Sequence, residues 1–158
     1  MSNLSTFLWS HIRTVPHFPK PGVDFYDLTP LFMNNLDSLT DALIASIPAE
    51  KLAEVESFIA VEARGFVLAS LLAQRTGKGL VLVRKAGKLP PPVVGVGYSL
   101  EYGLDRLEMA ADVQAQKVII VDDVLATGGT LKAVKQLAEK CDHQIFGAII
   151  FLDLPDLH

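Results

Sequence analysis

Four short apolar runs along the chain alternate with segments in which apolar residues recur at helical spacing. Each run is apolar almost throughout, as in strands that are buried on both faces. The runs cover residues 58–61, 80–83, 118–121 and 145–151. Residues 66–76, which end before Gly77, and residues 131–141 are predicted to be amphipathic helices. The alternation predicts an α/β fold, with a central and mainly parallel sheet flanked by helices.

Two segments depart from this alternation. Residues 1–30 are expected to be irregular, because closely spaced prolines interrupt any helix there, and a helix is then expected from Asp37 to Pro48. Residues 85–118 contain three successive prolines and several glycines, so a long loop is expected, followed by strand and turn between Tyr98 and Met109. Loops of this length inside a compact domain are usually functional or disordered.

Composition narrows the class of protein. Half of the 158 residues are hydrophobic, which allows a substantial core, and the formal net charge is −4. A mildly acidic protein has no general attraction for nucleic acid or an anionic membrane, so neither is expected as a partner. Cys141 is the only cysteine, which excludes an intrachain disulfide and a cysteine zinc site. No signal-peptide pattern and no apolar run of roughly 20 residues is present, so we expect a cytoplasmic location.

Residues 118–130 contain the strongest candidate for a binding site. An apolar strand ends in the adjacent carboxylates of Asp122 and Asp123, and Gly128 and Gly129 then open a helix. Backbone amides at such a helix start converge on an anion, and neighbouring carboxylates accept hydrogen bonds from a vicinal diol. The pattern therefore predicts a site for ribose 5-phosphate at the carboxyl end of a strand. Its residues are Asp122, Asp123, Ala126, Thr127, Gly128, Gly129 and Thr130.

The alternative interpretation of the same run is an ordinary strand-to-helix turn, with glycine for geometry and threonine for capping. The spacing fits neither a P-loop nor the G-x-G-x-x-G fingerprint of dinucleotide sites. The paired aspartates before the glycines favour the ribose phosphate.

Four cations follow strand ends in this acidic chain. Arg64 comes after the run 58–61, and Arg84, Lys85 and Lys88 come after the run 80–83. These cations indicate a local anion site, since a guanidinium can fork onto two phosphate oxygens. A solvated basic turn is the alternative interpretation.

Together these motifs resemble those of the type I phosphoribosyltransferases, and their order is similar to that in the adenine phosphoribosyltransferases. The run 118–130 resembles the family's signature for phosphoribosyl pyrophosphate (PRPP). The other matching motifs are Phe18-Pro19-Lys20-Pro21-Gly22-Val23, Ala63-Arg64-Gly65-Phe66, Val83-Arg84-Lys85-Ala86-Gly87-Lys88-Leu89-Pro90 and Tyr98-Ser99-Leu100-Glu101-Tyr102-Gly103. The resemblance implies a small N-terminal hood, residues 1–35, and a phosphoribosyltransferase core, residues 36–158, that includes a flexible lid loop over residues 87–103.

The resemblance also implies an activity in purine salvage. The 5-phosphoribosyl group would pass from PRPP to adenine, which gives AMP and pyrophosphate. Arg64, Lys85 and Lys88 would bind pyrophosphate, with Arg84 as a helper that can act across a dimer interface. Glu101 would be the acid/base that serves N7 of the purine.

The same resemblance implies a metal ion and an oligomeric state. Mg²⁺ would be carried by PRPP and not bound directly by the protein, near Asp122 and Asp123. Closure of the lid would exclude water from PRPP. The family is typically homodimeric, and we expect a homodimer here. It also continues beyond the position of Leu157, so truncation at His158 and a naturally short chain both stay open.

The base pocket matches the family less well. Asp24, Phe25 and Tyr26 align with the purine-recognition hood, where Phe25 would stack on the base, although core packing would explain this aromatic too. The family commonly has an aliphatic residue in place of Asp24 and arginine in place of Tyr26. Adenine is the first choice of base, and hypoxanthine, guanine and xanthine stay open. A non-catalytic regulator that binds PRPP or a nucleotide is a competing function, and a pyrimidine enzyme is a more distant one.

Overall fold

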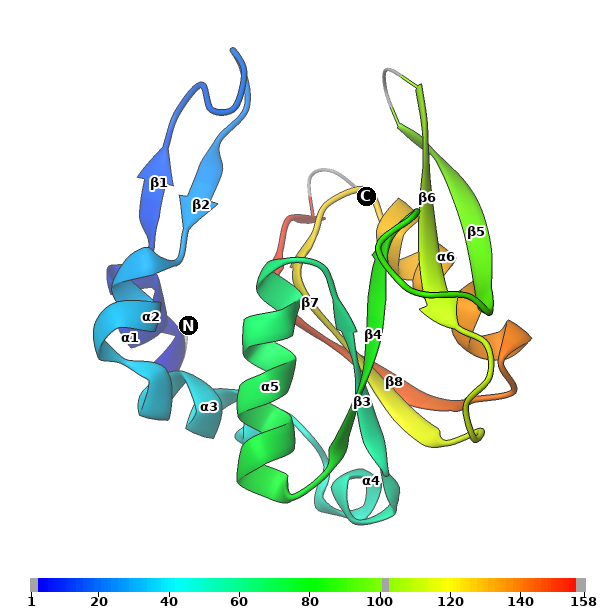
Figure 1. Cartoon of the computed structure of the whole chain (residues 1–158). Coiled ribbons are helices and arrows are strands. Elements are labelled where there is room, and N and C mark those ends of the chain that lie inside the picture. The colour runs from blue at the N-terminus through cyan, green and yellow to red at the C-terminus, as the bar shows by residue number, and fades with distance from the viewer. Residues whose placement is uncertain (1–2, 101–102, 156–158) are drawn as a thin grey trace. The chain divides into compact units, whose positions relative to one another are not determined.

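The computed structural model describes residues 3–100 and 103–155 of the chain. The chain forms two compact units, Met1–Ala45 and Ser46–His158 (Figure 1). The division falls after the third helix, because that helix packs on the helix before it.

The N-terminal unit consists of short helices and a two-stranded hairpin. Its elements are α1 (Asn3–Ser10), β1 (Arg13–Val15), β2 (Phe25–Asp27), α2 (Thr29–Asn34) and α3 (Leu36–Ala45). β1 and β2 pair antiparallel with Arg13 opposite Asp27, and the guanidinium donates to the carboxylate over 3.1 and 3.2 Å. The prediction of an irregular segment up to residue 30 is therefore wrong. None of the eight residues of α1 is fully buried, although Leu4, Phe7 and Leu8 recur at helical spacing.

A sheet of six strands, within the described residues, forms the centre of the second unit. Its strands are β3 (Ser57–Val61), β4 (Gly79–Lys85), β5 (Val93–Leu100), β6 (Gly103–Ala110), β7 (Lys117–Leu125) and β8 (Gln144–Asp153), in the order β5-β6-β4-β3-β7-β8. The four apolar runs are the four parallel strands β4, β3, β7 and β8, and β5 and β6 add an antiparallel hairpin at one edge. The predicted fold class is confirmed.

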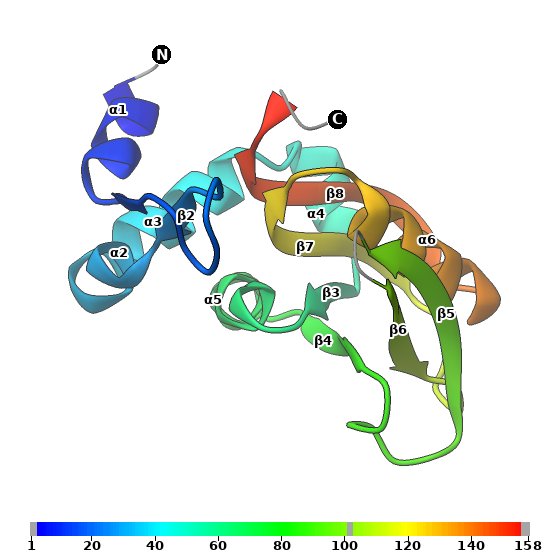
Figure 2. The ribbon, with the colours of Figure 1, turned by 90° about the horizontal axis from the view of Figure 1, so that it is seen from above.

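Helices cover both faces of this sheet. α5 (Arg64–Thr76) packs on β3, β4 and β7, whereas α6 (Gly129–Lys140) lies on the concave side and contacts β5 to β8 (Figure 2). The buried cluster between α6 and the sheet includes Ile59, Val83, Ile120, Val134 and Leu137. Each such side chain stabilises the fold by about 1.5–3 kcal/mol.

The helix boundaries differ from the predictions in a few places. α5 ends at Gly77, in the left-handed conformation with φ +71°, as predicted. α3 ends at Ala45, before Pro48, and a short helix α4 (Ala49–Glu54) follows that the sequence did not predict. Among the residues that the structure describes, no helix is long and apolar enough to cross a membrane.

Much of the segment predicted as a lid loop is a β-hairpin. β5 begins at Val93, directly after the three prolines, and pairs with β6 from Val93 opposite Ala110 to Leu100 opposite Gly103. A Cβ at Gly95 would collide with the guanidinium of Arg106, so this glycine marks a close approach and not the end of a strand. The prediction that the strand starts at Tyr98 is therefore wrong, while movement of the hairpin as a lid stays a prediction.

Candidate active site

The predicted ribose 5-phosphate site lies where β7 ends and α6 begins. Gly128 has φ +88°, a left-handed conformation that glycine adopts without strain, and α6 starts at the next residue. Thr127 Oγ1 accepts a long hydrogen bond of 3.5 Å from the amide of Gly129. A cavity of about 70 Å³ opens at this turn and is lined by Val124, Leu125, Ala126, Thr127, Gly128, Thr130 and Leu131. Because first-turn amides have no partner within a helix, this cavity suits a phosphate group.

Asp122 and Asp123 are adjacent but lie in different environments. Asp122 is 7% exposed, and its Oδ1 accepts a hydrogen bond of 2.8 Å from the amide of Asp123. Burial, together with the neighbouring carboxyl of Asp123, raises the pKa of Asp122 to about 8. Asp123 lies closer to the surface, and its Oδ2 accepts a hydrogen bond of 2.6 Å from Nε of Arg64. Burial therefore disfavours a charge on Asp122, whereas Asp123 has the Arg64 guanidinium as its partner.

Gly65 allows Arg64 to reach this pair. A Cβ on Gly65 would lie 3.0 Å from the carbonyl oxygen of Val121 and 3.6 Å from Cα of Asp122. A larger residue would hold the start of α5 away from β7. Arg64 is the first residue of α5, so this helix begins two residues before its predicted start at residue 66.

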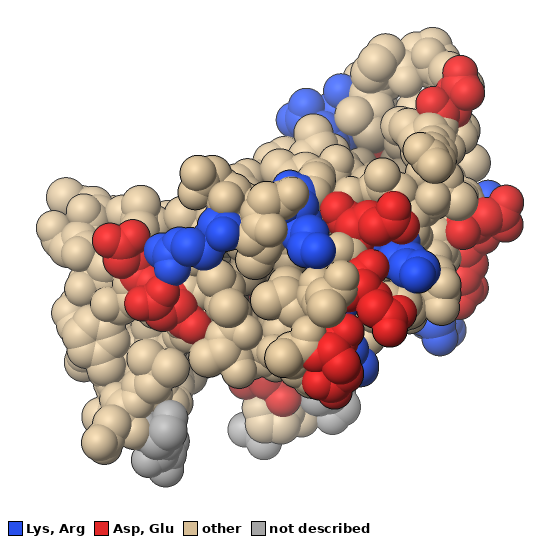
Figure 3. Space-filling view, turned by 90° about the horizontal axis from the view of Figure 1, so that it is seen from below, with Lys and Arg blue, Asp and Glu red and all other residues tan. Residues whose placement is uncertain are grey.

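Each of the four predicted pyrophosphate ligands pairs with a carboxylate of the same chain. The contacts are Arg64 Nε to Asp123 Oδ2 at 2.6 Å, Arg84 Nε to Glu62 Oε1 at 2.9 Å, Lys85 Nζ to Asp105 Oδ2 at 3.3 Å and Lys88 Nζ to Glu62 Oε2 at 3.9 Å. The side chains of Lys85 and Lys88 are 58% and 51% exposed, so their partners exchange readily for an incoming anion. Charge pairing extends beyond the site, since acidic and basic side chains lie next to one another on the face shown in Figure 3.

The sequence analysis missed the partners of these cations. Neither Glu62 nor Asp105 was predicted to contact them. Parallel pairing of Val61 with Val83 sets Glu62 beside Arg84, and the Arg84 guanidinium also lies 5.8 Å from the centre of the Phe66 ring. These contacts follow from the pairing of β3 with β4, which the sequence pattern does not reveal.

The predicted base ligands belong to the N-terminal unit. Phe25 packs edge-on against Phe18 with ring centres 5.2 Å apart, and Tyr26 packs edge-on against Trp9 at 5.8 Å. Because side chains alternate along a strand, Phe25 and Tyr26 lie on opposite faces of β2. They cannot both stack on one base from one face. Asp24 precedes the strand.

The predicted acid/base, Glu101, lies outside the described residues. The same holds for Tyr102, its neighbour in the motif. The described strand β5 ends at Leu100, before these two residues, and β6 begins at Gly103, after them.

The site offers oxygen ligands of the kind that magnesium prefers. Within residues 3–100 and 103–155, no cluster of three or more His, Cys, Asp and Glu side chains could hold a metal ion. Asp122 and Asp123 provide hard carboxylate oxygens beside the phosphate cavity. These residues fit a magnesium ion that is held mainly by a phosphorylated substrate.

The comparison with known proteins agrees with this geometry. The family described as "Phosphoribosyl transferase domain" matches residues 34–156, and the chain belongs to that family. It is 46% identical to the adenine phosphoribosyltransferase of Rubrobacter xylanophilus over 92% of this chain and 79% of the relative. It is 40% identical to the adenine phosphoribosyltransferase of Mycolicibacterium vanbaalenii over 99% of this chain and 90% of the relative.

A solved structure extends the likeness to the fold. The crystal structure of adenine phosphoribosyltransferase from Saccharomyces cerevisiae, in complex with adenine and an imino-altritol bisphosphate, matches with a TM-score of 0.93 at 32% identity. The match covers 99% of this chain and 92% of the yeast chain. The predicted resemblance to the type I phosphoribosyltransferases, and among them to the adenine phosphoribosyltransferases, is confirmed.

Proposed function

We propose that this protein is an adenine phosphoribosyltransferase of purine salvage, which converts adenine and PRPP to AMP and pyrophosphate. The phosphate cavity at the start of α6, next to Asp122 and Asp123, is the observation that carries the proposal. The identity of 40–46% to adenine phosphoribosyltransferases supports adenine as the base.

The residues divide between the parts of PRPP. The amides and hydroxyls of residues 126–130 bind the 5-phosphate, and Asp122 and Asp123 bind the ribose hydroxyls. The leaving pyrophosphate is bound by Arg64, Lys85 and Lys88, with Arg84 beside them. These cations stabilise the negative charge that grows on pyrophosphate as its bond to C1 breaks.

Glu101 and a magnesium ion complete the proposed chemistry. As N9 of the purine forms its bond to C1, the carboxylate of Glu101 accepts the proton from N7. Magnesium, bound through PRPP, supplies further positive charge for the phosphates. Asp122 and Asp123 would hold the ion mostly through hydroxyls or water.

A panel of bases tests the activity. Purified protein with Mg²⁺ and saturating PRPP is given adenine, hypoxanthine, guanine or xanthine, and pyrophosphate release is measured. Adenine is expected to be the best substrate. Faster turnover of another purine would correct the base, and PRPP binding without turnover of any base would favour a regulator.

The variant Glu101→Gln tests the assigned acid/base. It should lower kcat by about 10²- to 10⁴-fold while the affinity for PRPP stays close to that of the parent. An equal loss of PRPP affinity would mean that Glu101 acts in binding instead.

We also propose a homodimer. Val67 of α5 and Leu80 and Leu82 of β4 remain 37%, 41% and 39% exposed, which is unusual for large apolar side chains so close together. Leu82→Glu should shift the protein toward a monomer in light scattering, whereas Val113→Glu, at a position 45% exposed, should not. A parent that is already monomeric would contradict the homodimer. The proposed location is cytoplasmic, which the single free cysteine supports.

A further inference from the structure

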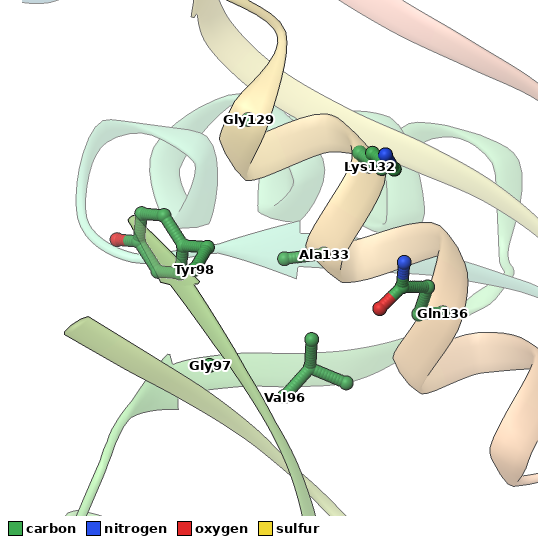
Figure 4. Close-up of a pocket in the computed structure, with 7 residues that line it drawn as sticks. All are labelled: Val96, Gly97, Tyr98, Gly129, Lys132, Ala133 and Gln136. Carbon is green, nitrogen blue, oxygen red and sulfur yellow. The ribbon is translucent and has the colours of Figure 1, made fainter. Parts of the chain in front are cut away.

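Tyr98 connects the β5–β6 hairpin to the first turn of α6. Its hydroxyl donates a hydrogen bond of 3.3 Å to Oδ2 of Asp105, the residue directly opposite on β6, and the side chain of Thr130 lies near enough to lower the pKa of Tyr98. Figure 4 shows the Tyr98 ring at the end of α6 where Gly129 lies. The ring lines a groove of about 330 Å³ between β5 and α6.

Asp105 continues this connection to Lys85. Its Oδ2 lies 3.3 Å from Nζ of Lys85, while its Oδ1 accepts a hydrogen bond of 2.8 Å from the amide of Arg106. The Arg106 amide and then Lys85 hold the pKa of Asp105 below its ordinary value. Burial, and then the charge of Asp105, raise the pKa of Tyr98. Asp105 is therefore ionised and Tyr98 protonated at neutral pH.

The direction of the hydrogen bonds follows from these charge states. Because Tyr98 gives its proton to Asp105, the Thr130 hydroxyl can act toward the Tyr98 oxygen only as a donor. Thr130 lowers the pKa of Tyr98, which is the effect expected of a donor. One continuous chain of contacts thus runs from Lys85 through Asp105 and Tyr98 to Thr130.

The two ends of this chain are groups that the proposed function gives to PRPP. Lys85 is assigned to pyrophosphate and Thr130 to the 5-phosphate, and each is occupied by a polar group of the hairpin. We infer that Asp105 and Tyr98 set the affinity for PRPP, because they hold Lys85 and Thr130 in the free enzyme and PRPP must displace them. This inference rests on the proposed function.

The size of the effect follows from exposure. Lys85 is more than half exposed and an exposed ion pair contributes little, so each contact should weaken PRPP binding by about two- to five-fold. Both competing groups come from one hairpin.

Two conservative variants test the inference. Asp105→Asn removes the charge that faces Lys85, and Tyr98→Phe removes the hydroxyl that faces Thr130. Calorimetric titration of Mg·PRPP without a base should give a dissociation constant about two- to five-fold lower for each variant. A merely structural role would leave this constant unchanged or raise it.

Fragments of PRPP separate the two ends. Asp105→Asn should strengthen binding of pyrophosphate but not of ribose 5-phosphate, and Tyr98→Phe should do the reverse. Glu54→Gln is the matched control, because it removes a carboxylate 4.0 Å from Lys117 at the start of β7 and should change neither. Thermal unfolding checks that each variant is folded.

The outcomes are distinct. Unchanged or weaker binding of the matching fragment by a folded variant overturns the inference. If one variant fails to fold, the other decides, since each acts on its own fragment. A parent that binds none of PRPP, pyrophosphate and ribose 5-phosphate contradicts the proposed function instead.

Discussion

The two ends of the proposed PRPP site are built by different means. The 5-phosphate end is made mainly by backbone, from a left-handed glycine and the first turn of α6, and its residues are consecutive in the chain. The pyrophosphate end is made by side chains from the start of α5, the end of β4 and the turn after it, and each of its cations pairs with a carboxylate of the protein.

The difference separates a subsite whose backbone is preformed from one whose side chains must exchange their partners. Backbone amides at a helix start are fixed by the fold and need no rearrangement to receive a phosphate. At the other end, pyrophosphate gains only the difference between its own charge and that of the carboxylates it replaces. The same carboxylates compete with pyrophosphate once it has formed, which favours its release.

Replacement of Asp122 should give the largest effect. It tests whether ionisation of this buried carboxyl destabilises the 5-phosphate end of the site. Burial raises its folded pKa to about 8 from the ordinary 3.8, so its contribution to stability is full below about pH 4 and is lost as the pH rises through 8. Asp122→Asn keeps an oxygen for the Asp123 amide and cannot ionise. Between pH 5 and 9 the free energy of unfolding of the variant should rise relative to the parent, on the order of a few kcal/mol.

Chemical denaturation across this pH range measures the effect. Asp112→Asn, which changes an exposed carboxyl, should show no such trend. If the difference between Asp122→Asn and the parent is the same at every pH, burial does not raise the pKa of Asp122.

Gly128 tests whether backbone geometry makes the preformed end. Gly128 and Gly77 have φ values of +88° and +71°, and a Cβ on either would meet nothing within 4 Å. Alanine at either position should therefore cost about 1–2 kcal/mol of stability from backbone strain alone. Only Gly128→Ala should also weaken PRPP binding, by about tenfold, because the amides at the cavity shift.

Denaturation and PRPP titration of both variants give the comparison. Gly77 caps the far end of α5, about 20 Å along that helix from Arg64, so it reports strain without the site. Equal losses of PRPP affinity would mean that general destabilisation, and not the cradle, explains the result for Gly128.

The sequence predicted the backbone-made end because all of its parts lie within residues 118–130. An apolar strand, two aspartates and two glycines before a helical stripe are local signals, and the structure brings them together as predicted. The four parallel strands could also be predicted, because each is an apolar run in the sequence.

The missed features depend on contacts between distant residues. Lys85 meets Asp105 because β6 lies antiparallel beside β4, an order that no local pattern states. The β1–β2 hairpin likewise depends on Arg13 and Asp27 meeting across a loop with no regular spacing. Gly95 shows the opposite error, since a residue that usually breaks strands lies within β5, beside the guanidinium of Arg106.

Glu62 should give the smallest effect, and it tests the exchanging end directly. Its carboxylate lies 2.9 Å from Nε of Arg84 and 3.9 Å from Nζ of Lys88. Glu62→Gln frees both cations, so pyrophosphate should inhibit at about two- to five-fold lower concentration, and added salt should shrink that gain. Glu54→Gln, far from the site, should leave inhibition unchanged. If Glu62→Gln weakens pyrophosphate binding instead, Glu62 orients Arg84 for the ligand, and this end of the site is preformed as well.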